Sequence, residues 1–239
     1  MELKQIHNEY ELKDSLEEFL IFGGYPEIIT TKDKKDKIRK IEEITHSYLL
    51  KDILELDRVK SSKILLDLLR LLAFQIGKEV SLTELGQQIG IDYKTVARYL
   101  DIFEKSFILF NVRGFSRNLR KEITKKSKYY FYDNGIRNAL IANFNDLELR
   151  NDVGQLWENF VFIERLKKRV YQDIFANVYF WRTWTQEEID LVEEREGKIF
   201  GYECKWQSKS LSPPRSWQEY YPEALFEVIS QENYFQFVT

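Results

Sequence analysis

The hydrophobic positions of residues 1–62 follow a helical period, and the pattern stops at a cluster of Gly and Pro. In ELKDSLEEFLIF the apolar side chains recur at the spacing of one helix face. Gly23, Gly24 and Pro26 then end this helix, because these residue types interrupt helical hydrogen bonding. A second helix is predicted from Lys34 to Leu56. The stretch therefore predicts helices joined by one sharp turn.

Residues 63–140 alternate between helix and strand patterns in the order of a winged helix-turn-helix. KILLDLLRLLAFQIG is an apolar helix that ends at Gly77, and SLTELGQQIG follows with Ser81 and Glu84 in capping-box spacing. After a turn at Gly90, Asp92 can cap the helix YKTVARYLDIFEKS. FILFNVRGF and KYYFYD then read as strands. The polar stretch between them cannot be buried, so we expect it to loop out as the wing.

Residues 141–239 combine helices with short strands. GQLWENFVFIERLKKRV predicts a helix whose buried positions are Leu156, Phe160, Ile163 and Leu166. Strands are predicted at about 178–184, 188–194 and 198–206, and NYFQFV is predicted as a last strand. The expected fold class is α/β (α+β). The predicted domains are a helical lid-like segment (1–62), a winged helix-turn-helix (63–140) and a C-terminal α/β domain (141–239).

The composition is that of a folded protein with no global affinity for nucleic acid. Hydrophobic residues make up 44% of the 239 positions and aromatic residues 15%, so a core of ordinary size can form. The formal net charge of −3 gives no overall attraction to phosphates. Any surface that binds nucleic acid must therefore be local.

One such local surface is predicted at the wing, in an otherwise acidic chain. The basic residues between positions 113 and 128 are Arg113, Arg117, Arg120, Lys121, Lys125, Lys126 and Lys128, and the single acid among them is Glu122. Such a cluster can neutralise several phosphates. On the preceding helix, Tyr93, Lys94, Thr95 and Arg98 can face a groove of DNA. The alternative is a solvated hairpin or a protein docking surface.

Cysteine and histidine are too sparse for several common kinds of site. Cys204 is the only cysteine, which excludes an intramolecular disulfide and a thiol framework for structural zinc. His7 and His46 are far apart in sequence, so a histidine metal site or a Ser/His triad has little support. The N-terminus has no apolar signal region, and no run reaches 18 apolar residues. We therefore expect a soluble, cytoplasmic chain without a membrane partner.

Charged residues interrupt the apolar strands of EEIDLVEEREGKIFGYECKW. Glu203 and Lys205 share one strand face, and the short connection around Gly197 predicts an antiparallel hairpin that brings Asp190 near Glu203. Two such carboxylates repel unless a cation holds both, and Mg²⁺ prefers oxygen ligands. Lys205 can then orient or deprotonate a water molecule. The alternative is a plain ion pair of Lys205 with Asp190 or Glu203 at a sheet end.

The order of these residues carries a resemblance. A helix glutamate (Glu158 in LWENFVF), a strand aspartate (Asp190) and a strand ExK (Glu203 and Lys205) resemble the PD-(D/E)xK nuclease superfamily. The whole chain resembles the C-terminal half of a group of prokaryotic AAA-type P-loop ATPases. The matching stretches are FGGYPEI (22–28), YLLKDI (48–53), KYYFYDNGIRNAL (128–140), WENFVFIERL (157–166), YFWRTWTQEEIDLV (179–192) and GYECKW (201–206).

The resemblance implies a lid-like segment, a winged helix and a restriction-endonuclease-like α/β/α domain. It also implies that Asp190 and Glu203 hold Mg²⁺ or Mn²⁺, that Lys205 positions the attacking water, and that Glu158 is an outer or extra ligand. The sequence has no GxxxxGK[ST] motif, so this chain cannot bind ATP through a P-loop. The expected partners are DNA and an ATPase domain or subunit.

Three functions remain open on the sequence. The first is a nucleic-acid-interacting module of an AAA-type ATPase that can act as a metal-dependent DNA endonuclease. The second is a catalytically inactive, nuclease-like scaffold that binds DNA or a protein and regulates the ATPase. The third is a transcription-factor role for the winged helix alone.

Overall fold

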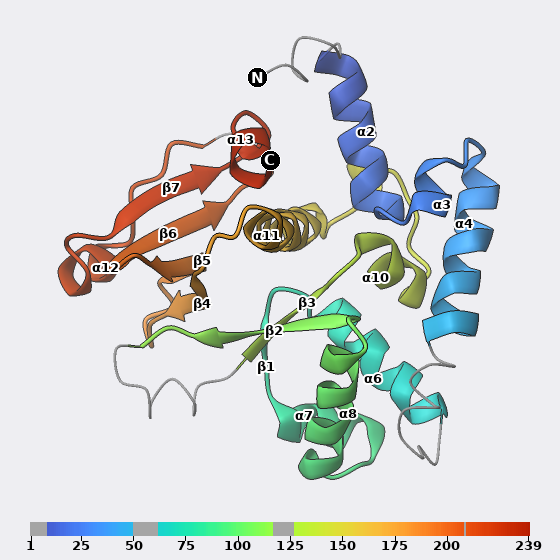
Figure 1. Ribbon diagram of the computed structural model, residues 1–239. Helices are drawn as coiled ribbons and strands as arrows, with labels where there is room; N and C mark the ends of the chain where they lie inside the picture. Colours follow the sequence, from blue (N-terminus) through green and yellow to red (C-terminus); the bar gives the residue numbers. More distant parts are fainter. Residues whose placement is uncertain (1–8, 50–61, 117–126, 208) are drawn as a thin grey trace. The chain divides into compact units, whose positions relative to one another are not determined.

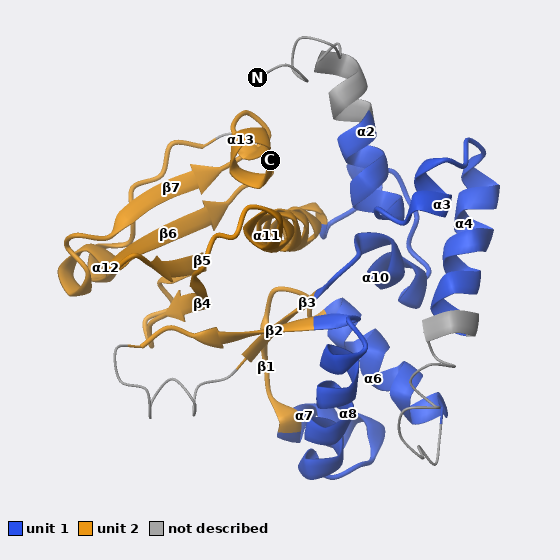
Figure 2. Ribbon diagram, viewed as in Figure 1, with its two compact units in different colours: residues 1–74, 83–109, 131–152 blue, residues 75–82, 110–130, 153–239 orange. Residues whose placement is uncertain are grey.

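The computed structural model describes residues 9–49, 62–116, 127–207 and 209–239. The chain folds as two compact units, each built from three separate segments of the sequence (Figure 2). Unit 1 contains the described residues within 1–74, 83–109 and 131–152, and unit 2 contains those within 75–82, 110–130 and 153–239. The fold is mixed α/β, as predicted, with a seven-stranded mixed sheet (Figure 1).

Unit 1 is helical. Its elements, labelled in Figure 1, are α2 (Glu9–Phe22), α3 (Pro26–Ile29), α4 (Lys34–Glu43), the π-helix η1 (Ile44–Leu49), α6 (Ser62–Phe74), most of α7 (Leu82–Ile89), α8 (Tyr93–Lys105), α10 (Asn134–Leu140) and the 3₁₀-helix η2 (Leu147–Leu149). The predicted turn at Gly23 is confirmed, since Gly23 has a φ of 80° just after α2. The predicted helix from Lys34 is α4 followed by η1, and residues 50–56 lie outside the described residues.

Helix α10 is the centre of unit 1 and packs against α2, α4 and α6. The buried amide of Asn138 donates hydrogen bonds to the carbonyl oxygens of Leu20 and Ile21, at 3.1 and 2.8 Å. These two carbonyls belong to the last turn of α2, where no intrahelical donor is available. The guanidinium of Arg137 donates to the carbonyl oxygen of Ala73 at 2.8 Å. Buried polar side chains of α10 therefore complete the ends of two neighbouring helices.

The sheet lies in unit 2, apart from one end residue each of β2 and β3. Its strands are β1 (Glu79–Val80), β2 (Leu109–Gly114), β3 (Ser127–Phe131), β4 (Asn177–Arg182), β5 (Glu188–Arg195), β6 (Lys198–Cys204) and β7 (Leu225–Ile229), in the order β1-β3-β2-β4-β5-β6-β7. β4, β5 and β6 form an antiparallel meander, and β7 runs parallel to β6. The three strands predicted between 178 and 206 are confirmed as this meander.

Three helices accompany the sheet in unit 2, namely α11 (Val153–Tyr171), α12 (Arg215–Tyr220) and α13 (Tyr234–Val238). Neighbouring residues of β5 show that α11 and α12 cover opposite faces. Val192 joins a buried cluster with Trp217 of α12, whereas the carboxylate of Glu193 accepts two hydrogen bonds from Arg165 of α11, at 2.8 and 2.9 Å. Successive strand side chains point to opposite faces, so the meander is a middle layer between helices.

The prediction for the last segment was wrong in one respect. NYFQFV, predicted as a strand, forms α13, and the final strand is LFEVI at 225–229. Phe237 of α13 packs on Tyr202 of β6, with ring centroids 4.6 Å apart. The aromatic spacing resembled a half-buried strand, but in the folded chain these rings close one end of the core.

Among the described residues, no helix combines the length and the apolar character that crossing a lipid bilayer would require.

Candidate carboxylate–lysine centre

The hairpin of β5 and β6 brings the predicted carboxylates together. Its antiparallel register pairs Leu191 with Tyr202, and one step further along the two strands lie Asp190 and Glu203. The pairing of β5 with β4 is irregular at the same place, because Tyr179 pairs with Val192 but Trp181 pairs with Ile189. A bulge of this kind redirects a side chain and is often found beside a functional site. Asp190 lies within this bulge.

Lys205 and the carboxylate of Glu203 form an ion pair. The Nζ atom of Lys205 lies 2.7 Å from Oε1 of Glu203, so the ion pair that the sequence left open is present. The other oxygen, Oε2, is buried and has no hydrogen-bond partner. Burial, with a further contribution from the charge of Asp190, raises the pKa of Glu203 to about 7. One buried oxygen of this carboxylate thus remains without a proton donor or a cation.

Asp190 is held by the backbone of the neighbouring strand. Its Oδ2 atom accepts a hydrogen bond from the backbone N–H of Cys204 at 2.8 Å. The side chain is buried, and burial raises the pKa of Asp190 although Lys128 and Lys205 act against this shift. Cys204 itself is a buried thiol whose pKa is raised well above its ordinary value by burial and by nearby carboxylates. A thiol of this kind is a poor nucleophile.

Glu158 approaches the same place from α11. The indole of Trp157 fixes this helix to the sheet by donating to the carbonyl oxygen of Ile229 at 3.2 Å. The hydroxyl of Tyr130 donates to Oε1 of Glu158 at 2.6 Å. Burial raises the pKa of Glu158 to about 8, against the opposing charge of Lys128. Gly77 leaves room for this carboxylate, since a Cβ atom there would lie 3.1 Å from Oε2 of Glu158.

Lys128 corrects the prediction for the basic cluster. It was counted among seven basic residues able to meet phosphates, but its side chain is only 1% exposed. Its ammonium forms an ion pair with Glu188 and lies 3.6 Å from Oε1 of Glu158. Burial lowers the pKa of this lysine, but the charges of Glu158, Asp190 and Glu188 more than offset that effect and raise it overall. Lys128 is therefore an internal cation.

We use the name carboxylate–lysine centre for this group of buried and half-buried side chains. Its members are Lys128, Tyr130, Glu158, Glu188, Asp190, Glu203 and Lys205. Lys128, Tyr130 and Glu188 were missed by sequence reasoning. Lys128 and Tyr130 alternate along one strand in KYYFYD, which is the signal that could have found them.

The donor set fits a divalent metal held by two carboxylates. The described part of the chain contains no group of three or more His, Cys, Asp or Glu side chains that could hold a metal ion. Asp190 and Glu203 remain as a pair, and the buried Oε2 of Glu203 has no other partner. Mg²⁺ is commonly bound by one or two carboxylates together with water and substrate oxygens. The centre meets that requirement without Glu158 as a ligand.

The predicted nucleic-acid-binding residues fall into two groups. Lys94 and Arg98 are exposed on α8, and Arg113 is exposed on β2. Asp92 caps α8 by accepting from the backbone N–H groups of Lys94 and Thr95, as predicted. The remaining residues of that prediction, Arg117, Arg120, Lys121, Lys125 and Lys126, lie outside the described residues.

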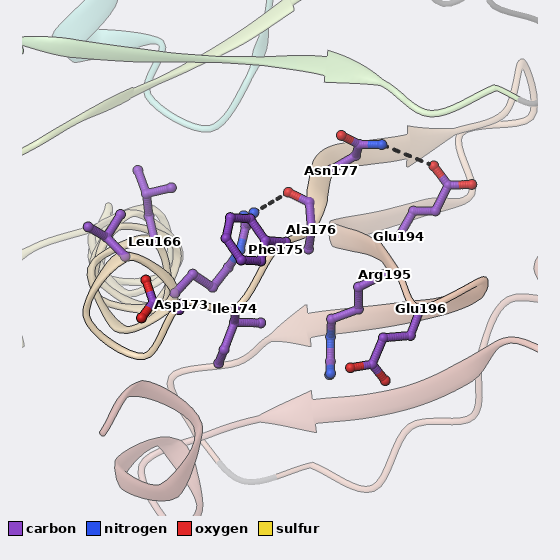
Figure 3. Close-up of a pocket in the computed structure, with 11 residues that line it drawn as sticks. Leu166, Asp173, Ile174, Phe175, Ala176, Asn177, Glu194, Arg195 and Glu196 are labelled. Atoms are coloured by element: carbon purple, nitrogen blue, oxygen red, sulfur yellow. Dashed lines mark hydrogen bonds between the residues drawn. The ribbon is translucent and has the colours of Figure 1, made fainter.

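A separate pocket of about 650 Å³ lies at the end of α11. Figure 3 shows its lining, which includes Phe175, Arg195 and Glu196. Arg169 donates to the carbonyl oxygen of Ala176, and the amide of Asn177 lies 3.5 Å from a carboxylate oxygen of Glu194. Neither the centre nor any residue predicted from the sequence to bind or to react lines this pocket. The pocket therefore adds nothing to the chemistry of the centre.

Comparison with protein-family models matches residues 13–147 to the family described as "Domain of unknown function (DUF8612)". The chain belongs to this family. Beyond this DUF8612 region, residues 153–234 match "Domain of unknown function (DUF4143)", a domain found in AAA-ATPase-associated proteins. The centre draws on both regions, since Lys128 and Tyr130 lie in the DUF8612 match and its other members in the DUF4143 match.

The relatives of this DUF8612 chain described next are named only as uncharacterized proteins. Uncharacterized protein Rv2008c of Mycobacterium tuberculosis is 25% identical over 185 residues, which cover 77% of the chain and 41% of the relative. Uncharacterized protein MJ1544 of Methanocaldococcus jannaschii is 26% identical over 164 residues, covering 66% of the chain and 35% of the relative. The chain thus spans less than half the length of these relatives. No solved structure matches it.

Proposed function

We propose that the chain is a nucleic-acid-interacting module of an AAA-type ATPase and that its carboxylate–lysine centre cleaves phosphodiester bonds with Mg²⁺ or Mn²⁺. The observation that carries the proposal is the buried, unpartnered Oε2 of Glu203 beside Asp190 and Lys205. A buried polar atom without a partner is costly, and a bound cation would satisfy it. Four carboxylates, at Glu158, Glu188, Asp190 and Glu203, face three cations, namely the ammonium groups of Lys128 and Lys205 and the guanidinium of Arg182, which lies 3.7 Å from Glu188. When all four carboxylates are ionised they outnumber these cations, and a bound divalent cation would offset the remaining negative charge.

Asp190, Glu203 and Lys205 each have a distinct task in this chemistry. Asp190 and Glu203 would hold the metal, which lowers the pKa of bound water and stabilises charge on the scissile phosphate. The backbone N–H of Cys204 fixes one oxygen of Asp190 and leaves the carboxylate oriented. Lys205 lies beside Glu203 and is partly exposed, so its ammonium can orient the attacking water or offset charge in the transition state. No histidine is needed.

The arrangement of unit 2 supports the nuclease-like interpretation. Along the chain, α11 carries Glu158, β5 carries Asp190, β6 carries Glu203, and Lys205 follows immediately. This is the order of helix glutamate, strand aspartate and strand ExK that the resemblance requires. The meander lies between helices on both faces, which agrees with an α/β/α domain.

The proposal of a nucleic-acid partner is supported by the element order α6-β1-α7-α8-β2-β3, which is the order of a winged helix. Helix α8 would be the recognition helix, with Tyr93, Lys94 and Arg98 exposed along it. The proposal of an ATPase partner is supported by the DUF4143 match. The relatives, of which the chain covers 41% and 35%, have room for a nucleotide-binding domain.

A second candidate function is a nuclease-like scaffold without turnover. One observation favours it: both lysines of the centre already form ion pairs, Lys128 with Glu188 and Lys205 with Glu203. Internal ammonium groups can neutralise buried carboxylates without a metal. The scaffold would then bind DNA or a protein and regulate the ATPase.

The test is incubation of plasmid DNA and single-stranded DNA with the chain and Mg²⁺ or Mn²⁺. We expect cleavage that falls at least about 100-fold in Glu203→Gln and in Lys205→Met, since each removes a group that acts in the transition state. Cleavage is followed as nicked and linear product on gels over time.

The matched control is Glu219→Gln, which neutralises an exposed carboxylate of α12 that is paired only on the surface with Arg215. It should cleave like the parent chain. Cleavage that persists in both centre variants would show that a contaminant or another site is responsible. If no metal supports cleavage of either DNA, the scaffold becomes the better proposal.

A further inference from the structure

We propose that the ammonium of Lys128 takes the place of a second cation in the carboxylate–lysine centre, so that the centre holds a single divalent metal, at Asp190 and Glu203. Lys128 is then a positioning residue, and Glu158 is one of the groups it holds. The inference rests on the proposed function, because it assumes that Asp190 and Glu203 hold a metal.

The centre has two ends that share Asp190. At one end Lys205 pairs with Glu203 at 2.7 Å. At the other end Lys128 pairs with Glu188 and lies 3.6 Å from Glu158. Asp190 interacts with both lysines. Carboxylates on three elements, α11, β5 and β6, thus surround the two ammonium groups.

Lys128 already fills the Glu158 end with positive charge. Oε1 of Glu158 receives a hydrogen bond from Tyr130 at 2.6 Å and faces the ammonium of Lys128 as well. Two positive charges a few ångströms apart, such as a metal ion and this ammonium, repel strongly in a buried environment. A divalent cation at Glu158 would therefore have to displace the ammonium from its carboxylates.

The fold gives Lys128 little freedom to move away. Its backbone lies in β3, which pairs with β1 through Glu79 opposite Lys128 and Val80 opposite Ser127. Its side chain is 1% exposed, and its ammonium also lies over the ring of Phe180, 5.1 Å from the centroid. Exposing this ammonium to water would require packed strands to separate. The binding energy of a weakly bound second metal is too small to drive that separation.

The inference joins the two family regions in one function. Lys128 and Tyr130 come from the DUF8612 region, and the carboxylates come from the DUF4143 region. A DUF4143 domain separated from β3 would lack its internal cation. The metal content of the centre then depends on a residue outside the nuclease-like domain.

The experiment counts Mn²⁺ bound at saturation, by calorimetry and by electron paramagnetic resonance, in the full chain. We expect one Mn²⁺ per chain for the parent and two for Lys128→Met, which removes the ammonium but keeps an unbranched side chain. Lys128→Arg retains the charge and should bind one. The double variant Lys128→Met, Glu158→Gln should return to one, because the second position needs the Glu158 carboxylate.

The matched control is Lys167→Met on α11, where a partly exposed ammonium pairs with the half-buried Glu164 at 2.6 Å. It should bind one Mn²⁺. Two Mn²⁺ in the parent chain, reduced to one by Glu158→Gln, would overturn the inference even if Lys128→Met does not fold. A folded Lys128→Met variant that still binds only one Mn²⁺ would also overturn the inference.

Failure of the proposed function gives a different result. A parent chain that binds no Mn²⁺, together with a Lys128→Met variant that binds one, would overturn the metal-dependent function but uphold Lys128 as the internal cation. Absence of Mn²⁺ from both would overturn both proposals.

Discussion

Single residues set the charge of the centre, and Glu158 shows how. Its carboxyl group is buried among other acids, and burial raises its pKa to about 8 from an ordinary 4.5. Glu203 is raised to about 7 for the same main reason. In both cases the folded state keeps a proton that the unfolded chain would release. Ionisation of these two carboxyl groups therefore lowers the free energy of unfolding.

This linkage predicts a stability that falls as pH rises. Between about pH 4.5 and pH 8 the folded chain binds more protons than the unfolded chain, so the free energy of unfolding decreases across that window. One pKa unit corresponds to about 1.4 kcal/mol, so the rise at Glu158 alone corresponds to a loss of the order of 5 kcal/mol over this window. The side chain of Glu158→Gln stays neutral at every pH, so this variant should lose less unfolding free energy than the parent chain as pH rises. Thermal unfolding from pH 5 to pH 8.5 at constant ionic strength measures this.

The control for this prediction is Glu164→Gln, which changes a half-buried glutamate of the same helix, paired with Lys167 rather than with the centre. Its melting temperature should follow the parent curve. If the curves of the parent and of Glu158→Gln run parallel, Glu158 does not hold its proton in the folded state.

The residues of the centre differ in how far the sequence predicts them. Asp190, Glu203 and Lys205 interrupt apolar strands, so alternation and a short turn were enough to place them at one hairpin. Glu158 depended on a resemblance, because one acid on an amphipathic helix has no special pattern. Lys128 was misjudged, since its charge matched the neighbouring basic loop and nothing local shows which strand becomes buried.

At the scale of elements, two stretches far apart in sequence are tied together by one carboxylate. Asp133 caps α10 by accepting from the N–H of Ile136 at 3.0 Å, and its other oxygen accepts from the N–H of Gly24 at 2.7 Å. A Cβ atom on Gly23 would lie 2.0 Å from Oδ1 of Asp133. The Gly-Gly pair after α2 is thus more than a helix stop, because it makes room for this contact.

Asp133→Ala should therefore cost more than an ordinary cap. Loss of a helix cap costs about 1 kcal/mol, and loss of a hydrogen bond to a charged acceptor about 1.5–3 kcal/mol. Asp92→Ala is the matched control, because Asp92 caps α8 and accepts only from the first turn of its own helix. Urea unfolding should show Asp133→Ala about 2 kcal/mol less stable than Asp92→Ala. Equal losses would mean that the contact to Gly24 contributes nothing.

The elements themselves were largely predictable, and the failures have physical causes. Helical periodicity and Gly or Pro stops located α2, α6, α8 and α11, and alternation located β4 to β6. The pattern of NYFQFV was ambiguous, because aromatic residues two apart suit a strand as well as a short helix. Packing against β6 decided for the helix. The contact of Asp133 with Gly24 could not be predicted from local sequence, since the two residues are 109 positions apart.

At the scale of the whole molecule, net charge and local charge act in opposite directions. The chain carries −3 overall, so a distant DNA duplex is not attracted by the molecule as a whole. The proposed DNA binding then has to come from local contacts with phosphates, and each contact releases counterions. The slope of affinity against salt therefore counts the contacts, whereas a single affinity does not.

This argument yields a numerical expectation for the exposed basic residues of α8. Each phosphate contact adds about 0.9 to the slope of log affinity against log salt for duplex DNA. Lys94→Gln with Arg98→Gln should therefore make the slope shallower by about 2, with the affinities converging at high salt. The same change at Arg117, Arg120, Lys125 and Lys126 should remove up to about 4. Fluorescence anisotropy of a labelled duplex across a salt series measures both slopes.

The matched control removes the same charge from the same unit but from a different helix. Lys34 and Arg39 are exposed on α4 and pair with Asp146 and Asp36. Their double replacement by Gln changes the net charge as much as the α8 pair does, so it should leave the slope unchanged if contacts decide binding. A slope that falls equally in both double variants would mean that DNA responds to the total charge, and the proposal that α8 is a recognition helix would be wrong.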